Sequence, residues 1–225
     1  MLLALDTSTA SITVCVYDED DDVVLAERNG LGPMKHGELL APAIADVLAE
    51  AGLARQDLTA IVVGVGPGPY TGLRVGVVTA RTLGYALEIP VYGVCSLDAL
   101  ARAAVADGLA EPFVVTTDAR RKELFWAEYD ASGARLDGPS VDRPVDLPAD
   151  LLVDLDDGAA TGRPVVGAGP ALYPDLFARG RGPRDPLAAD LARLVAAEAA
   201  ELVDPEPVYL RRPDAVAPGK PKPVS

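Results

Sequence analysis

Strand-like and helix-like segments follow one another in a restrictive order over the first hundred residues. We predict strands at 2–6, 11–17, 23–28, 60–65 and 91–95, and helices at 37–51, 72–87 and 96–106. For example, Ile12, Val14 and Val16 alternate with Ser11, Thr13 and Cys15, which is the period of a strand with one buried face. Successive strands form an antiparallel meander, and a helix between two strands lets them pair in parallel. We therefore expect one mixed sheet covered by helices.

The second half of the chain has a less regular hydrophobic pattern. We predict strands at 113–117, 123–129 and 164–167, a loop-like region at 131–163, a short helix at 170–178 and an amphipathic helix that contains Leu187, Leu191, Leu194, Val195, Ala199 and Leu202. Ser96 is the expected N-cap of the helix at 96–106, and Asp185-Pro186 is the expected cap of the last helix.

The element order of the first half is the RNase H-like order that occurs in each half of actin-like folds. We predict an α/β protein with two RNase H-like (actin-like, ASKHA) lobes, in which mixed sheets are flanked by helices and the second lobe is reduced. The expected division is an N-terminal lobe with partner-binding helices at 1–106, a smaller C-terminal lobe at 107–212 and a flexible tail at 213–225.

The charge and the cysteine and histidine content exclude several classes. With 20 Lys and Arg against 34 Asp and Glu, the net charge of −14 excludes a free-standing nucleic-acid binder, which needs a positive surface. Cys15 and Cys95 stand apart in apolar segments and predict buried, reduced thiols. His36 is the single histidine, so only a carboxylate Mg2+ site stays open as a metal centre. We find no membrane-spanning or leader segment and expect a cytoplasmic protein.

A glycine-rich loop at 64–76 joins a predicted buried strand to a predicted helix. Exposed backbone N–H groups at the start of the helix, with Arg74 nearby, suit an anion. The loop lacks the Gly-Lys-Ser/Thr of a P-loop, and the strand order before it differs from that of a dinucleotide-binding unit. Anion binding and a purely structural turn therefore both remain open.

Small residues recur at every fourth position of two predicted helices. The rows are Ala41, Ala45 and Ala49 in the first helix, and Gly72, Gly76, Ala80 and Gly84 in the second. Glycine inside a helix costs up to about 1 kcal/mol relative to alanine, so a repeated row indicates that another backbone approaches closely. That backbone belongs either to the chain's own sheet or to the helices of a partner.

Several motifs together resemble those of the TsaB family, and they extend from Leu3 to about Arg211. They are Leu3-Ala-Leu-Asp-Thr-Ser-Thr9, His36 ahead of Glu38-Leu-Leu-Ala-Pro42, Gly66-Pro-Gly-Pro-Tyr-Thr-Gly-Leu-Arg-Val-Gly76, Pro90-Val-Tyr-Gly-Val-Cys-Ser-Leu97, Asp118-Ala-Arg120 and Pro207-Val-Tyr-Leu-Arg211. The family consists of bacterial subunits of the machinery that makes threonylcarbamoyladenosine (t6A) in tRNA. The glycine-rich loop together with Asp-Thr-Ser-Thr at this spacing is a specific combination.

The resemblance implies a non-catalytic subunit that binds the catalytic subunit TsaD and helps to recruit the ATPase TsaE. It implies no cofactor, no metal and no catalytic residue in this chain, and contact with tRNA only through partners. The family's partner contact uses the two N-terminal helices, and a homodimer through the same face stays possible for the isolated chain. The implied partner-binding residues are Leu40, Ala41, Ala45, Ala49, Gly72, Arg74, Gly76, Ala80 and Leu83.

Other interpretations and single-residue roles remain open. Asp6 and the glycine-rich turns are compatible with a stand-alone actin-fold ATPase or small-molecule kinase, and a peptidase is a third possibility. The alternative role of Asp6 is to accept hydrogen bonds from its own turn at Thr7 and Ser8. Arg74 either anchors a partner carboxylate or an RNA phosphate, or serves at the surface. Asp118 and Arg120 are expected to hold a turn between the lobes as a charged pair.

Overall fold

The computed structural model describes residues 1–30, 35–152 and 162–211, so the tail predicted at 213–225 lies outside the described residues. The first half forms β1 (Leu2–Asp6), β2 (Thr13–Asp18), β3 (Val23–Arg28), α1 (His36–Glu50), β4 (Ala60–Gly64), α2 (Tyr70–Leu87), β5 (Val91–Val94) and α3 (Ser96–Ala106). The second half forms β6 (Phe113–Asp118), β7 (Leu124–Tyr129), β8 (Arg135–Asp142), β9 (Val165–Gly167), α4 (Gly169–Leu172), β10 (Gly180–Arg181) and α5 (Ala188–Ala196). Short 3-10 helices lie at Arg55–Asp57, Pro144–Asp146 and Ala149–Leu151.

Two five-stranded mixed sheets repeat one topology. The first has the order β3-β2-β1-β4-β5, and the second, read from its other edge, has the equivalent order β8-β7-β6-β9-β10. In each sheet the first three strands of the chain pair antiparallel, and the next two strands add in parallel to the first. This is the RNase H-like order, so the predicted α/β fold with two actin-like lobes is confirmed.

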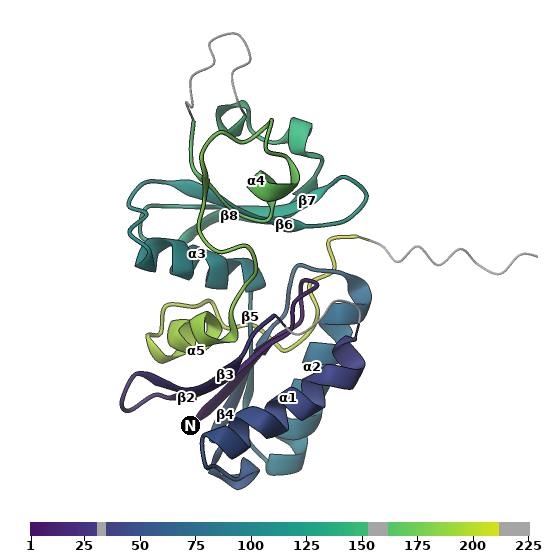
Figure 1. Ribbon diagram of the computed structural model, residues 1–225, viewed down its shortest axis with the longest axis vertical. Coiled ribbons are helices and arrows are strands. Elements are labelled where there is room, and N and C mark those ends of the chain that lie inside the picture. The colour runs from purple at the N-terminus through teal and green to yellow at the C-terminus, as the bar shows by residue number, and fades with distance from the viewer. Residues whose placement is uncertain (31–34, 153–161, 212–225) are drawn as a thin grey trace, which may run out of the picture.

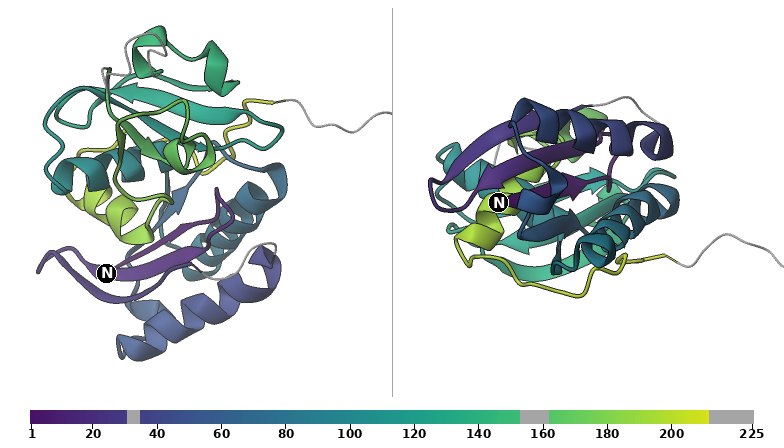
Figure 2. Two further views of the ribbon diagram at one scale, coloured as in Figure 1. Left: turned by 45° about the horizontal axis from the view of Figure 1, so that its top comes forward. Right: turned by 90° about the horizontal axis from the view of Figure 1, so that it is seen from below.

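The helices form layers outside and between the two sheets (Figures 1 and 2). α1 and α2 cover the outer face of the first sheet, while α3 and α5 lie between the sheets (Figure 1). The alternation along β1 explains this arrangement, because Leu3 and Leu5 enter the core under α1 and α2, whereas Leu2 and Ala4 enter the core under α5. β1 is thus buried on both faces.

The two central helices are exchanged between the halves of the chain. α3 follows β5 in sequence, but its Leu97 and Leu100 pack with Phe113 of the second sheet. α5 ends the second half, but its Leu191 packs on the first sheet. The division of the chain into lobes at residue 106 stays a prediction. The two hydrophobic cores do not follow this division, because each contains a helix from the other half of the chain.

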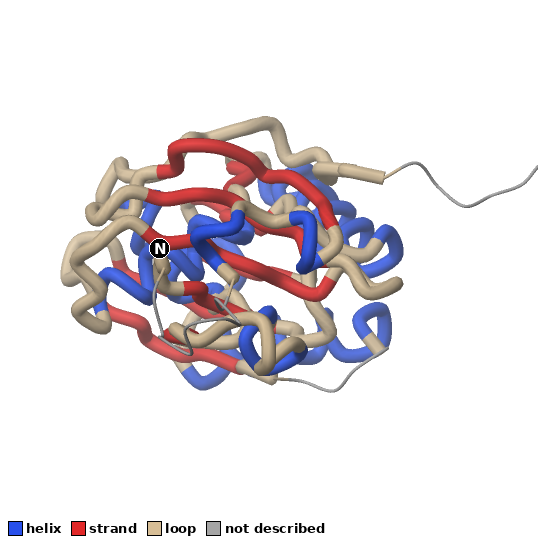
Figure 3. The backbone as a smooth tube through the Cα atoms, turned by 90° about the horizontal axis from the view of Figure 1, so that it is seen from above, coloured by secondary structure: helices blue, strands red, loops and turns tan. Residues whose placement is uncertain are grey.

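Of the region predicted as loop at 131–163, the described residues form β8 and two 3-10 helices, so the prediction was wrong for them, and residues 153–161 lie outside the described residues. β8 pairs with β7, and Trp126 Nε1 donates a 2.8 Å hydrogen bond to Asp142. The strand was missed because it lies at a sheet edge, where most of its residues are partly or fully exposed and no hydrophobic alternation is required. Short helical turns and loops cover the outer face of this sheet (Figure 3), with Leu151 and Phe177 buried beneath them.

Four predictions about helix ends were also wrong. α3 starts at Ser96 itself, with Cys95 as N-cap, and α5 starts after Leu187 without a side-chain cap from Asp185. α5 ends at Ala196, because Glu198 adopts a left-handed backbone with φ of 52°. The helix expected at 170–178 is the single turn of α4. For α3 the reason is a tertiary contact, because the Ser96 hydroxyl donates its hydrogen bond to Asp6 and is not used as a cap.

Candidate functional site

A buried hydrogen-bond network joins the end of β1, the glycine-rich loop and the start of α3. Asp6 is 1% exposed, and its Oδ1 accepts hydrogen bonds of 2.7 Å from both the backbone N–H and the hydroxyl of Ser8. Its Oδ2 accepts a 2.5 Å bond from the Ser96 hydroxyl, whose oxygen in turn accepts the Gly66 N–H at 3.1 Å. Burial raises the pKa of Asp6, and the hydrogen bonds from Ser96 and Ser8 oppose that rise.

The network leaves no room for a side chain at two glycines of the glycine-rich loop. A Cβ on Gly64 would lie 1.8 Å from Asp6 Oδ2, and one on Gly68 would lie 2.2 Å from the Ser8 carbonyl oxygen. Gly66 has a φ of 98°, which only glycine adopts readily. Gly64 and Gly68 are therefore required by contact with the end of β1 and its turn, and Gly66 by its backbone conformation, which supports the structural interpretation of this loop.

Removal of the Ser96 hydroxyl tests this hydrogen-bond network. We expect Ser96→Ala to lower the free energy of unfolding by about 1–3 kcal/mol at pH 7, because a buried carboxylate loses a donor. Since burial already raises the folded-state pKa of Asp6, ionisation of Asp6 costs stability above that pKa, and the cost disappears as the pH falls through it. The deficit of the variant should therefore shrink towards pH 4. Urea unfolding from pH 4 to 8 measures this, and a deficit that is constant with pH would contradict the role of Asp6.

The small-residue row of α2 faces its own sheet. A Cβ on Gly72 would lie 2.6 Å from the Thr7 carbonyl oxygen, and one on Gly76 would lie 2.3 Å from Thr7 Oγ1. The Thr7 hydroxyl also donates a 2.8 Å hydrogen bond to the Gly72 carbonyl. At the other end of the row, a Cβ on Gly84 would lie 2.2 Å from Val91 Cγ2. Close packing on β1 and β5 explains these glycines without a partner.

The predicted partner-binding residues therefore divide into a buried and an exposed group. Leu40, Gly72, Gly76 and Ala80 are buried and Leu83 is half-buried, whereas Ala41, Ala45, Ala49 and Arg74 are exposed. Only the exposed group is available for direct contact in this conformation. The exposed side of α2 also carries Val78, which is 59% exposed, and Tyr85, which is 89% exposed. We call Ala41, Ala45, Ala49, Arg74, Val78 and Tyr85 the α1/α2 surface.

The C-terminal motif lies against residues of both lobes, which the sequence did not indicate. The Tyr209 ring stacks on the Tyr70 ring with a centroid distance of 4.6 Å, and Arg74 Nε donates a 2.9 Å hydrogen bond to the Tyr209 hydroxyl. Arg211 forms an ion pair with Glu123 from the turn between β6 and β7. Arg74, a candidate anion anchor from the sequence, is thus engaged by two tyrosines.

The turn between β6 and β7 has an unusual backbone. Arg120, Arg121 and Lys122 have φ values of 60°, 55° and 63°, so three consecutive residues with side chains adopt the left-handed region. Asp118 supports the turn, because its Oδ1 accepts the Arg120 N–H at 2.7 Å and its Oδ2 lies 3.1 Å from Arg120 Nη1. The expected charged pair of Asp118 and Arg120 is present, but the expected location was wrong, because the turn joins two neighbouring strands of the second sheet and does not connect the lobes.

A cavity of about 310 Å³ lies between the lobes and is lined by Thr9, Ala10, His36, Gly37, Pro69, Thr71, Gly72, Val75 and Arg120. His36 Nε2 lies 3.0 Å from the Thr9 carbonyl oxygen, so this nitrogen is occupied as a donor. The lining residues come from the start of α1, the start of α2 and the first turn of each lobe. The two lobes and both outer helices therefore meet around this open space.

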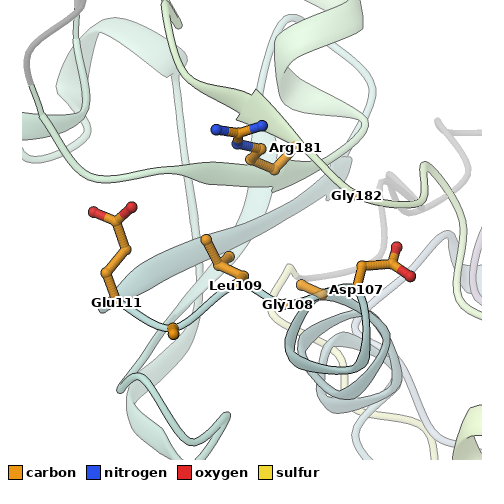
Figure 4. A pocket seen from close by; sticks show the side chains of 8 residues that line it. Asp107, Gly108, Leu109, Glu111, Arg181 and Gly182 are labelled. Atoms are coloured by element: carbon orange, nitrogen blue, oxygen red, sulfur yellow. The ribbon is translucent and has the colours of Figure 1, made fainter.

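A second cavity, of about 400 Å³, lies between the end of α3 and β10 (Figure 4). Its charged residues are Asp107, Glu111 and Arg181, and Glu111 is already paired with Arg179 at 2.6 Å. The hydrogen bond from Arg179 lowers the pKa of Glu111. The described residues that line this cavity include no nucleophile and no acid–base pair, so its chemistry indicates no reaction.

Within the described residues, no group of three His, Cys, Asp or Glu side chains is placed to hold a metal ion. Over the same residues, no helix is both long and apolar enough to cross a membrane. Cys15 and Cys95 are free and buried, as predicted, and burial raises the pKa of each thiol to about 12.

Comparison with known proteins identifies the family. The family model described as "TsaD: tRNA N6-adenosine threonylcarbamoyltransferase" matches residues 24–170. The Bacillus subtilis protein named tRNA threonylcarbamoyladenosine biosynthesis protein TsaB is 38% identical over 152 residues, which are 67% of this chain and 64% of that protein. The chain belongs to the TsaB family.

Two further proteins match this chain over nearly their whole length. An uncharacterized Mycobacterium tuberculosis protein is 43% identical over 217 residues, which are 95% of this chain and 93% of that protein. A crystal structure from Pseudomonas aeruginosa, described as an uncharacterized protein with similarity to peptidase YeaZ, is 31% identical with a TM-score of 0.76 and covers 93% of this chain and 99% of that one. The similarity to these two proteins extends along nearly the whole chain, whereas the match to the Bacillus subtilis TsaB covers two thirds of it.

Proposed function

We propose that this chain acts in the biosynthesis of threonylcarbamoyladenosine in tRNA, as a non-catalytic subunit that binds TsaD through the α1/α2 surface and helps to recruit TsaE. Membership of the TsaB family supports the pathway. The match to a TsaD family model over residues 24–170 supports a related fold in the partner, and related folds can pair through equivalent faces.

The α1/α2 surface has the composition of a contact surface. Val78 and Tyr85 are large hydrophobic side chains on the exposed side of α2, whose opposite side packs on its own sheet. Ala41, Ala45 and Ala49 form a row of small exposed residues on α1, which lies beside α2 on the same sheet (Figure 1), and a facing helix can approach closely at such a row. This pairing of exposed apolar anchors with a flat row is the observation that supports the surface most directly.

A non-catalytic role is supported by how the candidate catalytic groups are used. Both carboxylate oxygens of Asp6 accept hydrogen bonds from within the protein. Even a Cβ atom on the neighbouring Gly64 would overlap with this carboxylate. The ring nitrogen of His36 is held by a backbone carbonyl. These side chains serve the structure of the turn and are not directed at a substrate.

The net charge of −14 supports contact with tRNA through partners, because the chain as a whole repels phosphates. The recruitment of TsaE is part of the same proposal and rests on membership of the TsaB family.

The test is the mass of the complex by light scattering after size exclusion. The chain alone and TsaD alone are measured first, so that a homodimer of either is known. An equimolar mixture at tens of micromolar should then give a species with the mass of a heterodimer or its multiple. Two unchanged peaks at that concentration would count against the proposal, whereas a homodimer that is replaced by the heterodimer would place both on one surface.

The second candidate is a stand-alone ATPase or small-molecule kinase, which the position of the cavity between the lobes favours. It predicts that the isolated chain binds MgATP with measurable heat. A flat calorimetric titration at 100 µM protein, roughly the level needed for micromolar affinities, removes this candidate.

A further inference from the structure

The segment from Val208 to Arg211 is tied to the first lobe at the start of α2. The Val208 N–H donates a 2.8 Å hydrogen bond to the carbonyl of Val65 in the glycine-rich loop. Tyr209 then stacks on Tyr70 and accepts the hydrogen bond from Arg74. The Arg74 guanidinium lies 3.8 Å from the centre of the Tyr70 ring, so the three side chains form one stack.

Two residues later, the same segment is tied to the second lobe. Arg211 Nη1 donates a 2.7 Å hydrogen bond to the Ala119 carbonyl and forms the ion pair with Glu123. Its guanidinium also lies 5.9 Å from the centre of the Phe125 ring. Both polar partners belong to the turn between β6 and β7, which holds the left-handed residues. Figure 1 shows this yellow-green segment passing from the first lobe to the second.

The distance between the two attachments leaves little slack. One residue separates Tyr209 from Arg211, and a fully extended chain spans at most about 3.6 Å per residue. The contact of Tyr209 with Tyr70 and Arg74 is therefore only two residues along the chain from the contact of Arg211 with the turn. Pro69, Thr71 and Arg120, which are next in sequence to the two points of attachment, line the cavity between the lobes.

We propose that residues 207–211 form a strap that couples the α1/α2 surface to the β6–β7 turn, through the Tyr70, Arg74 and Tyr209 stack at one end and Arg211 at the other. Arg74 belongs to both the surface and the stack, so a partner that covers α2 acts on the turn through the strap. The partner in this statement rests on the function proposed above, but the link within the chain does not. By linkage, the order of the turn also changes the affinity of the surface for its partner.

Hydrogen exchange of the full chain tests the link at a distance. The turn is closed by two backbone bonds, from the Ala119 N–H to the Glu123 carbonyl and from the Glu123 N–H to the Arg120 carbonyl, both between 3.0 and 3.1 Å. We expect Tyr209→Ala and Arg74→Ala, both changed at the first-lobe end, to raise exchange of amides 119–123 several-fold. Tyr209→Phe keeps the ring stack and should have a smaller effect.

The matched control is Arg143→Ala, which removes an exposed arginine that is paired with Asp146 elsewhere on the second lobe. It should leave amides 119–123 unchanged. Exchange at these amides that equals wild type in both Tyr209→Ala and Arg74→Ala would overturn the strap. The substituted side chains are exposed, so folding should be retained, which unchanged protection of the β1 and β4 amides verifies.

A second arm adds TsaD and separates the two proposals. If TsaD binds, amides 119–123 should gain protection in wild type and lose that gain in Tyr209→Ala. Binding without any change at these amides would contradict coupling to the partner. Absence of binding would contradict the proposed function instead, while the free-chain comparison still decides on the strap.

Discussion

Gly64→Ala should lower the free energy of unfolding by about 3–5 kcal/mol, from the sum of overpacking and the loss of hydrogen bonds to a buried carboxylate. The added Cβ would lie 1.8 Å from Asp6 Oδ2 and 2.7 Å from Ser96 Oγ. Both side chains are held in place by hydrogen bonds and cannot easily move away. Since single domains are stable by roughly 5–15 kcal/mol, this one methyl group removes a large share of the total. Urea unfolding followed by circular dichroism measures the loss.

The control is Gly37→Ala, which makes the same chemical change in the first turn of α1. No heavy atom lies within 4 Å of a Cβ at Gly37, so the variant should match wild type or gain less than about 1 kcal/mol from helix propensity. Equal stabilities for the two variants would contradict the prediction. They would show that Asp6 and Ser96 can move enough to accept a methyl group at position 64.

Ala45→Arg should weaken binding of TsaD by roughly a hundredfold or more, which corresponds to about 3 kcal/mol. Ala45 lies in the middle of the exposed row of α1, so the long charged side chain would be forced into the centre of the contact and desolvated there. Because Ala45 is exposed and arginine forms helices well, the stability of the free chain should change by less than about 0.5 kcal/mol. Titration calorimetry with TsaD measures the affinity.

Ala106→Arg is the matched control, since Ala106 is also an exposed alanine in a helix but lies at the end of α3, away from the α1/α2 surface. It adds the same charge to the same acidic chain and should leave the affinity unchanged. Equal weakening by both variants would attribute the effect to net charge and not to the surface. Wild-type affinity in Ala45→Arg would exclude α1 from the contact.

Predictions from the sequence were accurate where local pattern and fold agree. The strands that flank Asp6 and the helices α1 to α3 lie within a few residues of their predicted bounds, because each has one or two apolar faces in a regular period. They failed for β8 and for the caps of α3 and α5. An exposed edge strand carries no period, and a serine such as Ser96 has the same local signal whether it caps a helix or bonds a distant carboxylate.

For the candidate site, the sequence identified the right segments but not their contacts. The glycine row of α2 was compatible with a partner or with the chain's own sheet, and the close approach of Thr7 to Gly72 and Gly76 decides for the sheet. The motif at 207–211 was visible as a motif, but its contacts were not. Tyr209 bonds Arg74 across 135 positions, and Arg211 bonds Ala119 across 92.

The sequence by itself determined the order of strands and helices in the first half of the chain, the α/β class and the family. These follow from periodicity and from motifs, which are properties of neighbours along the chain. Only the tertiary structure decided that α3 and α5 exchange sheets, that Asp6 is enclosed by Ser8 and Ser96, and that the C-terminal segment joins the lobes. Such contacts depend on which buried surfaces meet, and residues that are far apart in sequence carry no local signal of the partner that will cover them.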